Sequence, residues 1–132
     1  MKQTYSGGCH CGAVRYEADT DLSQGTLKCN CSICGKTRAW LAFVGPADFR
    51  LLQGEAALSD YRFGPKNIHH LFCKHCGVKS FARARTPNGD GFVVLVSCLE
   101  NIPAEELAAL PVMYVNGLHD DFQSPPAETR HL

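Results

Sequence analysis

Three clusters of cysteine constrain this chain of 132 residues more than any other feature of its sequence. Seven of its eight cysteines lie in the runs Cys9-His10-Cys11, Cys29-Asn30-Cys31-Ser32-Ile33-Cys34 and Cys73-Lys74-His75-Cys76. Cysteines with one or two residues between them can point their sulfurs at one ion, which is typical of zinc sites. A glycine follows each cluster, and we expect it to turn the chain away at positive φ: Gly12, Gly35 and Gly77. The pattern therefore predicts zinc binding.

The overall composition argues against several classes of partner. The 13 basic and 13 acidic side chains cancel, which gives no support for a nucleic acid or an anionic membrane as the partner. No run approaches the roughly 20 apolar residues of a membrane span, and the first six residues lack the apolar stretch of a secretion signal. We therefore expect a soluble, cytoplasmic protein, in which clustered cysteines are metal ligands or redox groups more often than structural disulfides.

Short segments of alternating polarity predict a mainly β, antiparallel architecture. The predicted strands are residues 13–18, 41–44, 59–63, 68–72, 79–85, 92–97 and 112–115. Turn-forming residues separate them, and the segment 86–91, Thr-Pro-Asn-Gly-Asp-Gly, predicts a hairpin.

Two short helical pieces complete this prediction. One turn is expected at 46–49, and a helix is expected at 103–110, where proline occupies the first helical position. The length of the chain is that of one domain with a modest core. We expect a single zinc-binding domain over residues 1–132, with a core of about 5–120 and a tail at 121–132.

The first and third clusters together supply the four ligands of a closed zinc site. Two pairs separated by about sixty residues can pin distant strands together, and these pairs are Cys9 with Cys11 and Cys73 with Cys76. A small domain with a thin β core gains folding energy from such a metal, so we expect this site to be structural. Disulfides and an iron–sulfur cluster are the alternatives to zinc.

The middle cluster has three sulfurs only. Cys29, Cys31 and Cys34 can surround one ion and leave a fourth position open, as in catalytic zinc sites. A fourth protein ligand would instead close the site; the candidates are Cys98, His69, His70 and His119. Oxidation of the cluster to a disulfide with release of zinc is a further alternative.

Other side chains near the clusters have less specific interpretations. His10 and His75 lie between paired cysteines and are expected to face solvent, and Cys98 ends the apolar run 92–97 and is expected to be a buried, inert thiol. Four cations flank the clusters, and we expect them to balance the charge of the thiolates: Lys36, Arg38, Lys74 and Lys79. Those beside the open site could alternatively hold a substrate carboxylate.

No catalytic residue can be assigned from the sequence. The only candidates that titrate near neutral pH are His69, His70 and His119, and for His69 and His70 a surface or core role is the better interpretation.

The order and surroundings of the clusters resemble the glutathione-dependent formaldehyde-activating enzyme family, which also includes centromere protein V. The resemblance runs from Gly7 to about His119 and rests on Gly7-Gly8-Cys9-His10-Cys11-Gly12-Ala13-Val14-Arg15-Tyr16, the middle cluster, and Phe72-Cys73-Lys74-His75-Cys76-Gly77. It implies a β-tent fold, two antiparallel sheets meeting at an angle, with one or two short helices and a zinc staple. It also implies a structural zinc on Cys9, Cys11, Cys73 and Cys76 and a second zinc, at a substrate site, on Cys29, Cys31 and Cys34.

The named enzymes of that family combine glutathione with formaldehyde to give S-hydroxymethylglutathione. The resemblance therefore implies a zinc-dependent enzyme of the carbon–sulfur lyase type, acting on a thiol such as glutathione and a small aldehyde such as formaldehyde. The second zinc would be the labile one. The end of the motif region, residues 114–120, is closer to small bacterial members without an assigned substrate. The alternatives are a non-catalytic module with two zinc ions, structural or protein-binding, and a thiol redox sensor.

Overall fold

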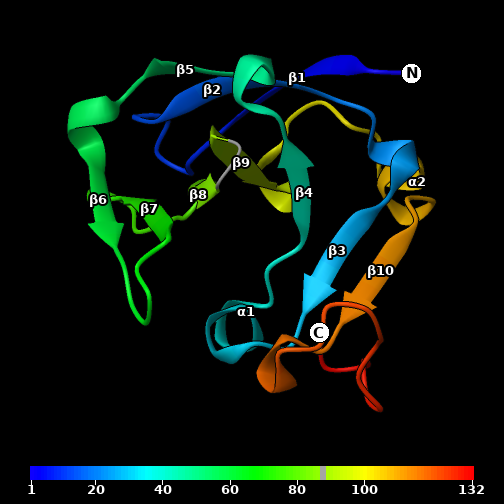
Figure 1. The fold of residues 1–132 in the computed structure, drawn as a ribbon. Helices are drawn as coiled ribbons and strands as arrows, with labels where there is room; N and C mark the ends of the chain where they lie inside the picture. The colour runs from blue at the N-terminus through cyan, green and yellow to red at the C-terminus, as the bar shows by residue number, and fades with distance from the viewer. Residues whose placement is uncertain (87–88) are drawn as a thin grey trace.

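The computed structural model describes residues 1–86 and 89–132, which form ten strands in two sheets and two short α-helices (Figure 1). The strands are β1 (Gln3–Gly8), β2 (Arg15–Thr20), β3 (Thr26–Cys29), β4 (Leu41–Val44), β5 (Phe49–Gln53), β6 (Leu58–Tyr61), β7 (Ile68–Cys73), β8 (Phe81–Thr86), β9 (Gly89–Leu95) and β10 (Val112–Val115). The α-helices are α1 (Ser32–Thr37) and α2 (Ala104–Ala108). Single 3₁₀ turns lie at Leu22–Gln24, Pro46–Asp48, Glu55–Ala57, Val96–Cys98 and Gly117–His119.

The two sheets differ in size. The smaller has the order β1-β2-β5, and the larger has the order β10-β3-β4-β9-β8-β7-β6. In Figure 1 the small sheet lies across the top, and the two ends of the large sheet, β6–β7 and β3–β10, descend on opposite sides. This arrangement confirms the predicted mainly β class with two sheets.

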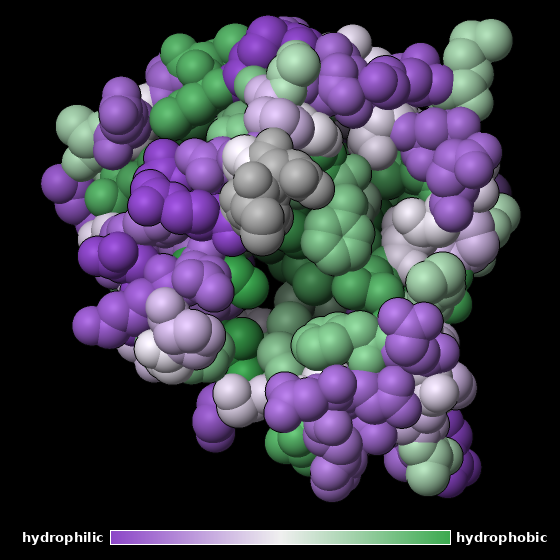
Figure 2. Space-filling view, in the orientation of Figure 1, coloured by the Kyte–Doolittle hydropathy of each residue, from purple (hydrophilic) through white to green (hydrophobic). Residues whose placement is uncertain are grey.

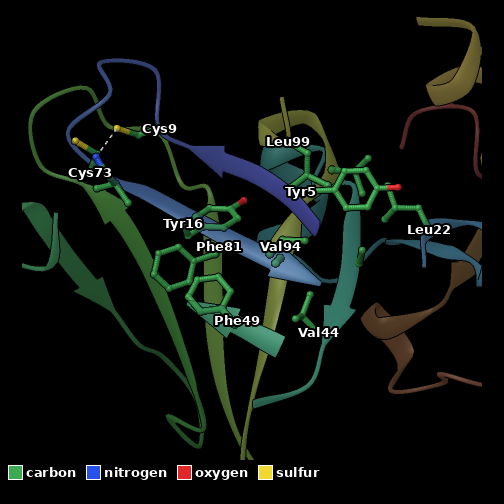
Figure 3. Packing of buried hydrophobic residues seen from close by; sticks show 14 of the residues in the cluster. Tyr5, Cys9, Tyr16, Leu22, Val44, Phe49, Cys73, Phe81, Val94 and Leu99 are labelled. Carbon is green, nitrogen blue, oxygen red and sulfur yellow. Dashed lines mark hydrogen bonds between the residues drawn. The ribbon is translucent and has the colours of Figure 1, made fainter. Parts of the chain in front are cut away.

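Aromatic side chains from both sheets form the centre of the core. Tyr16 on β2 and Phe49 on β5 pack against Phe81 on β8, with ring centroids 5.1 Å apart for Tyr16 and Phe49 and 4.8 Å apart for Phe49 and Phe81 (Figure 3). Phe92 on β9 stacks on Phe49, with ring centroids 4.2 Å apart. Tyr16 follows the alternation predicted for its strand, because its neighbour in the chain, Arg15, is only half-buried. Aromatic pairs of this kind add about 0.5–1.5 kcal/mol each beyond the area they bury. The core therefore lies between the sheets and holds them together.

One pair of strands departs from the antiparallel expectation. β10 runs parallel to β3, with Val115 opposite Cys29, whereas the other described pairs in both sheets are antiparallel. The parallel pairing carries the segment that follows β10 past the end of β3, where the middle cysteine cluster begins. The segment after β10 therefore lies beside the middle cysteine cluster, which is part of the candidate site.

Most predicted elements are present. β4 and β10 have the predicted bounds, and the turn and helix expected at 46–49 and 103–110 appear in shorter form. β8 and β9 pair up to Thr86 and Gly89, while residues 87–88 of the predicted hairpin turn lie outside the described residues. The missed elements are β1, β3, β5 and α1.

The face seen in Figure 2 is hollowed at its centre, and apolar side chains gather there between the two ends of the large sheet. The same orientation in Figure 1 places α1 below this hollow. Among the described residues, the helices are all too short or too polar to cross a membrane.

Candidate metal centres and the adjoining cavity

The first and third cysteine clusters meet at one end of the core. Cys9 and Cys11 lie in the loop between β1 and β2, Cys73 ends β7, and Cys76 lies in the turn that follows. The four Sγ atoms lie within 4.8 Å of one another, and Figure 3 shows Cys9 and Cys73 side by side. The fold thus brings together two pairs that the chain separates by about sixty residues.

The geometry of this four-cysteine cluster fits a tetrahedral zinc ion. A zinc–sulfur bond of about 2.3 Å gives a tetrahedron whose edge is about 3.8 Å. The Sγ of Cys11 lies 3.7 Å from that of Cys9 and 3.6 Å from that of Cys73. Backbone N–H groups also donate to the sulfurs, from Val14 to Cys9 at 3.3 Å and from His75 to Cys73 at 3.4 Å. Such donors stabilise thiolate ligands.

The glycines that follow the clusters behave in two ways. Gly12 has φ +85° and Gly77 has φ +79°, as predicted for a chain that turns away from a metal site. Gly35 differs, because it lies inside α1 and is not among the described residues with positive φ. The prediction was wrong at Gly35 because a helix, not a turn, carries the end of the middle cluster.

The middle cluster is built by one strand end and one helix. Cys29 ends β3, Cys31 is the residue that caps the N-terminus of α1, and Cys34 follows three residues later in α1. Residues three apart on a helix lie on the same face, so the Cys31 and Cys34 sulfurs converge toward Cys29. All three Sγ atoms lie within 4.8 Å of one another, and the Cys31 N–H donates to the Cys29 Sγ at 3.4 Å.

Hydrogen bonding within this cluster favours one thiolate. The thiol of Cys34 lowers the pKa of Cys31 to about 5, and the same bond raises the pKa of Cys34. Burial raises the pKa of Cys29. Cys31 is therefore the first of the three to carry negative charge.

No fourth protein ligand joins these three sulfurs among residues 1–86 and 89–132. The Nδ1 of His69 is instead 2.7 Å from a carboxylate oxygen of Asp60, and His119 is exposed. The Cys98 thiol is half-buried and directs its hydrogen toward the Lys79 carbonyl oxygen at 3.8 Å. Of the four candidates only His70 lines the same cavity as the cluster, and it remains outside the group.

The segment after β10, residues 116–118, lies directly against the middle cluster, a position that the sequence did not predict. The Asn30 side chain donates to the Asn116 side-chain oxygen at 2.9 Å and accepts from the Leu118 N–H at 3.0 Å. Between these two contacts, Gly117 approaches the cluster so closely that a Cβ there would collide with the Sγ of Cys29. The parallel β3–β10 pairing places this segment, and the sequence offered no local signal for that pairing.

A cavity of about 240 Å³ opens beside the middle cluster. The three cysteines form part of its wall, and the rest comes mainly from aliphatic and aromatic side chains of the large sheet and α1, among them Leu27, Phe43 and Val93. By contrast, the four-cysteine cluster adjoins the core, where Val14 is fully buried. Only the middle cluster therefore has both an incomplete ligand set and an adjoining cavity among the described residues.

The polar part of this wall is the pair Lys79 and His70. The Lys79 ammonium lies 2.8 Å from the Nδ1 of His70, and a cation must be the donor of that bond. Burial, and then the nearby Lys79, lower the pKa of His70 to about 4, so its ring is neutral at pH 7. The sequence placed Lys79 with three other flanking cations, but those three, Lys36, Arg38 and Lys74, are exposed.

A comparison with protein families identifies the chain. The sequence model of the family described as glutathione-dependent formaldehyde-activating enzyme (GFA) matches residues 4–116. The chain belongs to this family. The match confirms the resemblance carried by the cysteine motifs. Both cysteine clusters of this GFA member are groups that could hold metal ions.

A solved structure is similar in fold and sequence. The crystal structure of a Rhodobacter sphaeroides protein is 29% identical to this GFA chain, with a TM-score of 0.69. The alignment covers 82% of this chain and 99% of that chain.

Proposed function

We propose that this protein is a zinc-dependent enzyme of the carbon–sulfur lyase type, which joins a thiol to a small aldehyde such as formaldehyde at the Cys29, Cys31 and Cys34 cluster. One observation carries the proposal: a cluster of three thiols, with no fourth ligand in the described part of the chain, opens into a cavity in a GFA-family protein. Membership of the GFA family makes glutathione the first thiol to test.

The proposal divides the metal ligands by role. Cys9, Cys11, Cys73 and Cys76 would hold a structural zinc, and residues 1–132 would act as one zinc-binding domain. Cys29, Cys31 and Cys34 would hold the second zinc, whose charge would favour the thiolate form of an incoming thiol. All eight cysteines are free, which suits a reducing compartment such as the cytoplasm.

The chain's own contribution to the reaction is to position the reactants. In the addition, a carbon–sulfur bond forms between thiol and carbonyl carbon, the carbonyl double bond becomes single, and the thiol proton is transferred in net terms to the oxygen. Apolar walls formed by side chains such as Leu27 and Phe43 would hold the two reactants together. Proximity of this kind can supply several kcal/mol of the barrier.

Two measurements test the proposal. Exchange NMR of formaldehyde with a thiol, with and without the zinc-loaded protein, should show a faster addition than the uncatalysed reaction. Two thiols are compared, glutathione and a small thiol with one carboxylate (ω-mercaptohexanoic acid), and at least one of them should react faster. Native mass spectrometry should show two zinc ions per chain, of which one becomes labile in excess thiol. Two equally inert ions, with no rate increase for either thiol, would favour a purely structural module instead.

A further inference from the structure

The cavity beside the middle cluster exposes apolar surface that the fold does not cover. Phe43 is 66% exposed, Phe63 39%, Ile68 44% and Phe122 59%, and all four line this cavity. They come from separate parts of the chain, β4, the turn after β6, the start of β7, and the segment after the last 3₁₀ turn. Exposed apolar side chains that converge on one cavity mark a binding site more often than an accident of folding.

One charge interrupts this apolar wall. Lys79 is the only charged side chain among the described lining residues, apart from the cysteines themselves, and no Asp, Glu or Arg accompanies it there. His70 accepts one of the three hydrogens of its ammonium and so fixes the direction of the others. The wall thus offers an aligned cation to a ligand that is otherwise apolar.

Glutathione matches this wall poorly. It carries two carboxylates, one ammonium and two amide groups, whereas the wall offers one cation, no carboxylate and one imidazole. Each polar group that is buried without a partner costs about 1–3 kcal/mol. The cavity volume of about 240 Å³ is also below the roughly 300–1,000 Å³ of sites for drug-sized ligands.

We propose that the thiol substrate of this protein is a small apolar thiol bearing one anionic group, with its carbon chain against Phe43 and Phe63 and its anionic group on Lys79. Lys79 is then the residue that determines specificity, and His70 is the residue that positions it. This inference rests on the proposed function for the thiol and goes beyond it by naming the chemical class of that thiol.

A competing role for Lys79 is to balance the negative charge of the thiolate cluster. The two roles predict different results for a substitution that removes the charge. Loss of charge balance would weaken zinc binding equally whatever thiol is present, whereas loss of a ligand contact would weaken only the binding of anionic thiols.

Isothermal titration of the zinc-loaded full chain with a matched series of thiols tests the proposal. The series is ω-mercaptohexanoic acid, the neutral ω-mercaptohexanol, the cationic ω-aminohexanethiol, and glutathione. We expect the acid to bind at least about tenfold more tightly than the alcohol, because hydrogen bonds to charged groups are the stronger ones. The amine and glutathione should bind more weakly than the alcohol.

Variants at one position separate the two roles. Lys79→Met should abolish the preference for acid over alcohol and leave the affinity for the alcohol within about twofold, while Lys79→Arg should retain the preference. Lys66→Met is the matched control, because Lys66 is exposed in the turn near Phe63 and does not line the cavity. Zinc content and far-UV circular dichroism confirm that each variant is folded and loaded.

The outcomes also separate this inference from the proposed function. Tightest binding by glutathione, or an acid preference that survives in Lys79→Met, would overturn the inference and leave the proposed function intact. Failure of every thiol to bind the zinc-loaded chain would overturn both.

Discussion

The two cysteine clusters use the same side chain but are built in opposite ways. The four-cysteine cluster joins the loop after β1 to the end of β7, and its Cys11 and Cys73 are 62 residues apart in the chain. The three-cysteine cluster is local, since Cys29 to Cys34 span only the end of β3 and the start of α1. A metal at the first cluster would close a long loop of chain, whereas a metal at the second would close almost none.

This difference in chain separation predicts a difference in role. A clip that closes a long loop restricts the unfolded chain most, so its metal contributes most to folding. A local cluster can lose its metal while the strands around it stay paired, which leaves the site free to exchange ligands. The contrast can be tested by removing one ligand from each cluster.

The largest effect is expected from Cys73→Ser. Cys73 is fully buried, and its loss would break the cluster that joins β7 to the loop after β1. Structural zinc in small domains contributes about 10–16 kcal/mol of apparent binding energy, which matches or exceeds the whole stability of a typical domain. We therefore expect unfolded or insoluble protein, measured by circular dichroism and by the yield of soluble chain.

Cys98→Ser is the control for this change, because Cys98 belongs to neither cluster. It should leave a folded chain with its metal content unchanged. A Cys73→Ser protein that melts at the wild-type temperature would show that the four-cysteine cluster is not a staple.

A smaller effect is expected from Cys31→Ser. The variant should remain folded within about 2 kcal/mol of wild type, because β3 keeps its pairing with β4 and β10. It should bind one zinc ion per chain instead of two, as counted by native mass spectrometry. Insoluble protein from both cysteine variants would mean that both clusters are structural, and the proposed difference in role between them would be wrong.

Gly117→Ala tests the local cluster without removing a ligand. The added Cβ would collide with the Sγ of Cys29 and lie 3.1 Å from the Cβ of Cys31, so the cluster must shift. We expect a loss of about 10–100-fold in zinc affinity at the second site, comparable to other changes around metal ligands, with the first zinc retained. Competition with a chelator measures both affinities in one titration.

Gly35→Ala is the matched control for Gly117→Ala. It places the same methyl group on the same cluster, but the nearest heavy atom to the new Cβ is the Asn30 carbonyl oxygen at 3.6 Å. Since Gly35 is helical, alanine should be neutral or stabilising there. Equal losses of zinc from the two variants would show that the close approach of Gly117 to Cys29 does not determine zinc binding at this site.

The sequence predicted the grouping of the cysteines better than the surroundings of each group, and the reason is the range of the signal. Spacing within each cluster is local, so the two groups of cysteines could be proposed directly, and the structure brings each group together. The alternation of β2 was equally local. By contrast, α1 was missed because Ser32-Ile33-Cys34-Gly35-Lys36-Thr37 contains weak helix formers and a glycine.

The contacts that assemble the site from separate elements could not be predicted. Asn116 and Gly117 reach the middle cluster because β10 runs parallel to β3, and Lys79 lies on the cavity wall with its ammonium bonded to His70 on β7, a contact that the sequence did not predict although it named both residues. Neither pairing leaves a pattern in the sequence near those residues. The cavity and its one cation are therefore properties of the fold.

The smallest effect on stability is expected from a hydrogen bond that joins the same two parts of the chain as the four-cysteine cluster, but without a metal. Tyr16 on β2 donates a hydrogen bond of 2.9 Å to the Ser80 carbonyl oxygen, which lies just beyond Cys76 and connects the same two parts of the chain. Tyr16→Phe should cost about 1 kcal/mol in free energy of unfolding and leave both zinc ions bound. Denaturant unfolding measures this cost, and Tyr61→Phe, at an exposed position, is the control.

The pH dependence of the stability lost in Tyr16→Phe provides a second test of the same hydrogen bond. Burial raises the pKa of Tyr16 above the value of about 10 that it has in the unfolded chain. The folded state therefore holds the phenol proton when the unfolded state releases it, so the stability of wild type falls as pH rises above about 10. Tyr16→Phe lacks this titration, and its deficit relative to wild type should shrink above that pH. A stability deficit that stays constant up to pH 11 would mean that the phenol is not buried against Ser80 as described. Aromatic packing alone would then have to join β2 to the segment after Cys76 in the absence of metal.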